Sequence, residues 1–95
     1  LTLAQKANNL RPDDPAVMDT LGWIYYKNGD TNKALDFIGK ANAKAAQNAV
    51  INYHMGMVLY KVGRLSEAKE QLKKALASKE DFEGKEEAKK TLEKM

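Results

Sequence analysis

Apolar residues recur every three or four positions along most of this chain, and short polar segments separate the apolar runs. Side chains with that spacing lie on one face of a helix. The pattern predicts an all-α fold, with helices over residues 1–10, 15–28, 31–46, 49–62, 65–78 and 83–94.

Residues that start and stop helices mark the boundaries of these segments. Asp14 precedes Pro15, which predicts an N-cap followed by proline at the first helical position. Asn48 lies 34 residues after Asp14 and predicts a second N-cap of the same kind. Gly29 and Gly63 each follow a helical segment and are expected to end it in a left-handed conformation. Because the links between helices are short, neighbouring helices must run antiparallel and form hairpins.

The sequence repeats itself with a fixed period. Residues of the first copy recur 34 positions later, among them the pairs Gly22/Gly56, Tyr26/Tyr60, Gly29/Gly63 and Ala34/Ala68. A fixed period of this length indicates stacked repeats. Glycine inside a helix costs about 1 kcal/mol relative to alanine, so the helical glycines predict close contacts between helices. We expect Gly22 to face the helix that contains Ala34, and Gly56 to face the helix that contains Ala68.

Composition narrows the class of protein. The chain has 95 residues, enough for one small domain, and no cysteine, which excludes disulfides and thiolate metal sites. Its 16 Lys and Arg against 13 Asp and Glu give a net charge of +3, but the two signs are interleaved as on solvated helix faces. We therefore expect no nucleic-acid binding and, because no apolar run is long enough, no membrane contact. The chain opens within a helical pattern, so we expect it to be a piece of a longer protein.

Residues that could support catalysis are sparse. His54 is the single histidine, whereas a metal site usually needs several His, Cys or carboxylate ligands together. Asp13 and Asp14 lie at a helix start, where a cap and a turn explain them. Glu86 and Glu87 lie among lysines and fit a solvated helix face. We expect no enzyme activity, no cofactor and no metal.

The repeated segment resembles the tetratricopeptide repeat (TPR) family, whose pattern spans 34 residues. The first complete copy, residues 15–48, has family-type residues at Met18, Leu21, Gly22, Tyr25, Ala34, Ile38 and Ala41. The second copy, residues 49–82, has the matching positions Asn52, Met55, Gly56, Leu59, Ala68, Leu72 and Ala75. Asn52 departs from the family pattern, which has a large residue there.

The resemblance implies a TPR-like α-solenoid of antiparallel helix hairpins. Residues 1–14 correspond to the second helix of a truncated preceding repeat, residues 15–48 and 49–82 to two TPR repeats, and residues 83–95 to a C-terminal capping helix. Such a cap keeps a polar outer face. Truncation before Leu1 would bare an apolar face, through which this fragment could dimerise.

Members of the family line a concave groove with the first helix of each repeat. Carried over position by position, the resemblance predicts a partner-binding groove formed by Asp19, Trp23, Tyr26, Lys27, Val50, Tyr53, Met57, Tyr60 and Lys61. Helical spacing supports the assignment, because Asp19, Trp23 and Lys27 fall on one stripe. Aromatic residues and methionine are typical of adaptable binding surfaces.

Several of these positions also fit a structural role. Tyr26 and Tyr60 occupy positions where the family often packs a tyrosine, and Met57 suits the core as well as the groove. Trp23 is expected in the groove because the neighbouring core positions are filled. His54 either bridges two hairpins or lies on the surface, or else donates a hydrogen bond to a ligand from the groove edge.

Three functions compete. The first is a non-enzymatic interaction module that binds a peptide or a helix of a protein partner in the concave groove. The second is a structural spacer or self-association segment with no dedicated ligand. The third, RNA or polyanion binding through the lysines, would be strongly dependent on salt.

The groove residues limit the kind of ligand. Some family members hold a C-terminal carboxylate with Lys and Asn, but the corresponding positions here are Asp19, Trp23, Tyr53 and Met57. The resemblance therefore does not extend to a carboxylate clamp. Lys27 and Lys61 place positive charge at one end of the groove and favour an acidic flank on the ligand.

A narrower resemblance concerns residues 13–23, residues 52–56 and the cap. They are similar to large bacterial TPR lipoproteins that accompany exopolysaccharide export and the PEP-CTERM sorting system. This resemblance implies a bacterial cell-envelope or periplasmic parent protein; without it the expected location is cytoplasmic.

Overall fold

Five helices account for the regular structure of the residues that the computed structural model describes, 14–79 and 81–95. They are α2 (Pro15–Lys27), α3 (Thr31–Lys44), α4 (Ala49–Lys61), α5 (Leu65–Ala77) and α6 (Lys85–Glu93). The expected helix over residues 1–10, the unit 1–14 apart from Asp14, and the proposed dimer face lie outside the described residues. The fold class predicted from the sequence, an all-α stack of hairpins, is confirmed for the described part.

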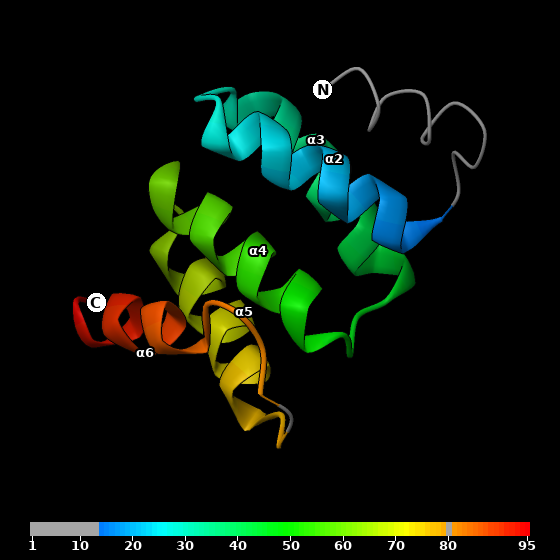
Figure 1. The fold of residues 1–95 in the computed structure, drawn as a ribbon. Helices are drawn as coiled ribbons and strands as arrows, with labels where there is room; N and C mark the ends of the chain where they lie inside the picture. The colour runs from blue at the N-terminus through cyan, green and yellow to red at the C-terminus, as the bar shows by residue number, and fades with distance from the viewer. Residues whose placement is uncertain (1–13, 80) are drawn as a thin grey trace.

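The helices are arranged as two hairpins and a final helix. The α2–α3 hairpin stacks on the α4–α5 hairpin, and α6 lies against α5 and α4 (Figure 1). The first helices of the two hairpins, α2 and α4, contact each other, and α4 also contacts α6. These three helices, α2, α4 and α6, therefore follow one another along one side of the stack.

Capping side chains fix where the helices begin. The Asp14 carboxylate accepts hydrogen bonds from the backbone N–H of Ala16 at 2.9 Å and of Val17 at 3.4 Å. The Asn48 side chain accepts from Ile51 N–H at 3.1 Å. Each cap satisfies a backbone donor that has no partner within its own helix. The N-caps predicted at Asp14 and Asn48 are confirmed.

Glycine ends α2 and α4 in the same way. Gly29 has φ 87° and Gly63 has φ 88°, in the left-handed region that side chains disfavour. Beyond Gly29, Asp30 N–H donates to Tyr25 C=O at 2.9 Å, and beyond Gly63, Arg64 N–H donates to Leu59 C=O at 2.9 Å. These are the long hydrogen bonds of a Schellman motif, so both turns have one geometry.

Two helix limits differ from the sequence prediction by two residues. The helix α3 ends at Lys44 instead of residue 46, because the backbone leaves the helical region at Ala45, with φ −133° and ψ 58°. The helix α6 begins at Lys85 instead of residue 83, because Gly84 before it has φ 98°. Left-handed backbone at that position delays the start of the helix.

Two glycines give the hairpins equivalent internal packing. A Cβ built on Gly22 would lie 2.5 Å from Ile38 Cγ1, and one built on Gly56 would lie 2.6 Å from Leu72 Cδ2. Ile38 and Leu72 are fully buried, in α3 and α5 respectively, and stand one 34-residue period apart. The prediction that the helical glycines mark close contacts with the second helix of each hairpin is confirmed.

The core includes one polar substitution. Asn52 is 1% exposed, at the repeat position that Met18 occupies in the first copy. Its side-chain oxygen accepts no hydrogen bond from a described residue. The departure from the family pattern noted in the sequence thus leaves a polar atom unpaired within the described part of the core.

Candidate functional site

Aromatic rings from two neighbouring first helices form a continuous row. Trp23 of α2 stacks on Tyr26, with centroids 4.6 Å apart, and on His54 of α4, with centroids 4.0 Å apart and an interplanar angle of 18°. Tyr53 lies 5.3 Å from His54 and 5.7 Å from Phe82. We call this set, Tyr26, Trp23, His54, Tyr53 and Phe82, the aromatic row. It joins α2, α4 and the segment before α6.

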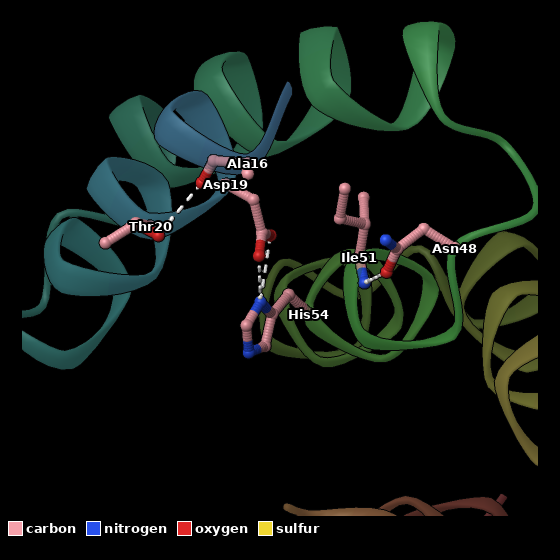
Figure 2. A network of polar contacts seen from close by, with 6 residues as sticks. All are labelled: Ala16, Asp19, Thr20, Asn48, Ile51 and His54. Atoms are coloured by element: carbon pink, nitrogen blue, oxygen red, sulfur yellow. Dashed lines mark hydrogen bonds and ion pairs between the residues drawn. The ribbon is translucent and has the colours of Figure 1, made fainter. Parts of the chain in front are cut away.

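A histidine–carboxylate pair holds α2 against α4. His54 Nδ1 lies 2.8 Å from both carboxylate oxygens of Asp19 (Figure 2). Because a carboxylate only accepts hydrogen bonds, Nδ1 carries the hydrogen in this contact. The two side chains are 11% and 9% exposed. His54 therefore bridges two hairpins, one of the roles that the sequence left open.

A second polar contact joins α4 to α6. The Tyr53 hydroxyl donates to Glu87 Oε2 at 3.2 Å, and the Tyr53 side chain is buried. A Cβ on Gly84 would lie 2.5 Å from the Tyr53 ring, so only glycine lets the chain pass this close to the ring. A spacing of 34 residues separates Asp19 from Tyr53 and Tyr53 from Glu87. Asp19 of α2 bonds to α4, and Tyr53 of α4 bonds to α6.

Two tyrosines of the aromatic row, Tyr53 and Tyr26, have raised pKa values. Burial raises the pKa of Tyr53 above its usual range, and the nearby Glu87 carboxylate adds to this effect. Burial, and secondarily Glu87, also raise the pKa of Tyr26. Both hydroxyls therefore stay protonated at neutral pH and can serve as hydrogen-bond donors.

A hollow lies in front of the aromatic row. Its volume is about 560 Å³, and it is lined by Trp23, Lys27, Val50, Tyr53, His54, Glu83, Gly84 and Glu87. A second hollow of about 480 Å³ is lined by Tyr26, Lys27, Gly29, Thr31 and Lys61. Lys27 belongs to both, and its Nζ lies 5.7 Å from the centroid of the Trp23 ring. We call the two hollows together the groove.

Most of the predicted groove residues meet here. Six of them line the groove, namely Trp23, Tyr26, Lys27, Val50, Tyr53 and Lys61. Asp19 is buried in its contact with His54, and Met57 is buried in the cluster that α6 covers. Tyr60 is half-buried and lines neither hollow.

Three lining residues come from the segment that the sequence pattern assigned to the cap. Glu83 and Glu87 bring carboxylates to the hollow, and Gly84 lines it close to the Tyr53 ring. The period contains the signal for Glu87, which stands 34 residues after Tyr53 and so takes the same face of the next helix. The lysines around Glu87 in the sequence had instead predicted a solvated helix face for this residue.

The described residues include no group of three or more His, Cys, Asp or Glu side chains that could hold a metal ion. Within the same residues, no helix has both the length and the apolar character needed to cross a membrane.

Comparison with known proteins supports the repeat assignment. A family model described as tetratricopeptide repeat matches residues 25–86, which is more than half of the chain. A TPR repeat-containing protein of Pseudomonas aeruginosa is 44% identical over 39 residues, which make up 41% of this chain and 7% of that protein. The chain thus corresponds to a small part of its relative. Repeats of the tetratricopeptide repeat family generally serve as protein-interaction modules and typically carry no catalysis. The family match shows that the chain belongs to this family, in agreement with its 34-residue period and its equivalent glycine contacts.

Proposed function

We propose that this chain binds an extended peptide segment of a protein partner in the groove. The observation that carries the proposal is the position of Trp23. This residue is half-buried between Tyr26 and His54 in the aromatic row, it lines the larger hollow, and Lys27 lies beside it. Tryptophan and tyrosine are the residues most enriched among those that dominate binding energy at protein interfaces.

The shape of the groove favours an extended segment. It crosses α2, α4 and α6, and neighbouring packed helices lie about 8–10 Å apart, so the path across them is roughly 18 Å long. An extended chain rises about 3.3 Å per residue, and about six residues would therefore cover that path. A partner helix, about 10 Å in diameter, needs a broader trough and is the second candidate occupant.

The chemistry of the walls also suits a peptide. Val50 is 38% exposed and offers apolar surface next to the rings of Trp23 and Tyr53. The larger hollow has the carboxylates of Glu83 and Glu87, and the smaller hollow has the Lys61 ammonium group, while Lys27 lines both. These charged groups can fix the position of a peptide with polar side chains. The partner-binding residues that we propose are Trp23, Tyr26, Lys27, Val50, Tyr53 and Lys61.

A phage-displayed library of random dodecapeptides tests this proposal. The chain, immobilised through its C-terminus, should enrich a set of related peptides, and Trp23→Ala should abolish their capture while its far-ultraviolet circular dichroism stays helical. Leu65→Ala is the matched control, because Leu65 is a large apolar residue of α5 that is 49% exposed and outside the groove. Equal capture by Trp23→Ala would place the binding surface elsewhere. Failure to enrich any peptide would favour a structural spacer.

We also propose a cell-envelope location for the parent protein. The support is the similarity of residues 13–23 and 52–56 to TPR lipoproteins of exopolysaccharide export and PEP-CTERM sorting. The full-length sequence tests this directly, because such a parent begins with a lipoprotein signal. Fractionation of the full-length protein into membranes after lipidation would support the proposal, and recovery in the cytoplasm would overturn it.

A further inference from the structure

We infer that the groove selects a peptide with opposite charges at its two ends: an arginine or lysine beside Glu83 and Glu87, and an acidic residue between Lys27 and Lys61. This inference rests on the proposed function and specifies the chemistry of the partner. Glu83 and Glu87 line the larger hollow, Lys61 lines the smaller one, and Lys27 lines both.

The acidic end is formed by two carboxylates on one side of the start of α6. Glu83 and Glu87 are four residues apart, both are exposed, and both line the larger hollow. Glu87 accepts a hydrogen bond from the buried Tyr53 hydroxyl, which fixes its position. Glu83 is also close enough to Tyr53 for its charge to contribute to the raised pKa of that hydroxyl.

The nearest lysine of α6 points away from this end. Lys85 Nζ donates to Ser78 C=O at 3.2 Å and lies 6.0 Å from the Phe82 ring, and Lys85 does not line the hollow. His54 lines the hollow, but its Nδ1 is engaged by Asp19. The two carboxylates therefore line the hollow without a lysine of their own helix, and Lys27 of α2 lines it with them.

The surface beside the carboxylates suits the stem of a long basic side chain. Val50, Trp23 and Tyr53 give an apolar wall along the same hollow. Lysine and arginine lay their aliphatic stems on such surfaces while the charged group reaches a polar partner. Arginine fits better than lysine, because its planar guanidinium can donate to two carboxylate oxygens at once.

The basic end is formed by lysines one period apart. Lys27 and Lys61 occupy the last turns of α2 and α4, both are exposed, and both line the smaller hollow with Tyr26. Two ammonium groups on neighbouring helices can hold one carboxylate between them. Because Lys27 belongs to both hollows, the acidic and basic residues of the ligand should lie within about six residues of each other.

To test the inference, the dissociation constants of three peptides enriched by the dodecapeptide selection are measured by calorimetry. The double variant Glu83→Gln/Glu87→Gln should bind them about tenfold more weakly, because partly exposed charge pairs are modest individually and add when two act together. Glutamine at residue 87 keeps an oxygen that accepts from Tyr53. The control Glu86→Gln/Glu93→Gln removes the same charge from exposed positions of α6 and should leave binding unchanged.

Substitutions in the peptides complete the test. Replacing their arginine or lysine with alanine should weaken binding to the wild-type chain about tenfold but have little further effect on Glu83→Gln/Glu87→Gln. Replacing their acidic residue with alanine should also weaken binding to the wild-type chain, but it should have little further effect on binding to Lys27→Gln/Lys61→Gln. If selected peptides require Trp23 but bind the carboxylate variant as tightly as the wild type, the charge inference is wrong and the proposed function stands. If no peptide depends on Trp23, the proposed function fails first.

Discussion

His54 of α4 and Asp19 of α2 form a contact in which Nδ1 lies 2.8 Å from both carboxylate oxygens, with both side chains nearly out of solvent. This pair connects α2 to α4 through polar groups. It also places the imidazole against Trp23 in the larger hollow.

We predict that His54→Ala lowers the free energy of unfolding by about 2 kcal/mol, because it leaves the Asp19 carboxylate with little solvent and no described partner. Urea denaturation of the single variants and of the double variant with Asp19→Ala would measure the coupling between them. Thr20→Ala, which loses only an exposed bond to Ala16 C=O, should change stability little. Strictly additive effects of His54→Ala and Asp19→Ala would contradict this assignment.

Tyr53 makes stability fall at alkaline pH. Its pKa is raised in the folded state, so folding favours the neutral phenol. The contribution is fully present below the ordinary tyrosine pKa of about 10 and is lost as pH rises above it. Tyr53→Phe should cost about 1 kcal/mol at pH 7, through the lost bond to Glu87, and should lose less stability than the wild type between about pH 10 and 12. Thermal melts over that range, with absorbance at the phenolate band, provide the measurement. If the stability of the wild type and of Tyr53→Phe fell equally with rising pH, the role of Tyr53 would be refuted.

Replacing Gly22 or Gly39, which both lie within helices, by alanine should change stability in opposite directions. Gly22→Ala places a Cβ 2.5 Å from Ile38 Cγ1 and 3.1 Å from Ile38 N, so we expect a net loss of about 1–2 kcal/mol despite the better helix propensity of alanine. Gly39→Ala is the matched control within α3, where the nearest atom is Met55 Cε at 4.0 Å. It should stabilise the protein by up to about 1 kcal/mol. Chemical denaturation distinguishes the two, and a stabilised Gly22→Ala would show that the hairpin contact yields easily.

Gly84 determines how closely the start of α6 approaches α4. Gly84→Ala adds a Cβ 2.5 Å from the Tyr53 ring and places alanine at φ 98°. We expect a loss of about 2 kcal/mol and a displaced α6, because steric strain and an unfavourable backbone conformation act together. Hydrogen exchange of the α6 amides should become faster, while that of the α2 amides stays nearly as slow as in the wild type. Unchanged exchange in α6 would mean that the segment adapts without moving the helix.

The periodic features of the sequence predicted the hairpins, their caps and the glycine contacts. These depend on interactions within one repeat, and each is encoded by residues at fixed spacing, such as Asp14 and Asn48. Helical spacing likewise indicated which face of α2 carries Trp23 and Lys27.

The depth of each groove residue was less predictable, because it depends on the neighbouring helix. Met57 lies beneath α6 and is buried, whereas Trp23, one period earlier, is followed by α4 and keeps part of its surface. The contribution of Glu83 and Glu87 depends on the turn at Gly84, whose positive φ has no signature beyond the glycine itself.

Asp19 and Tyr53 occupy equivalent repeat positions, and each bonds forward to the next first helix. One polar contact therefore joins α2 to α4, and another joins α4 to α6. Within each hairpin, the two helices pack closely at a glycine. Under tension, we expect the chain to flex at the α2–α4 and α4–α6 contacts before its hairpins open, so that the proposed groove can change its curvature.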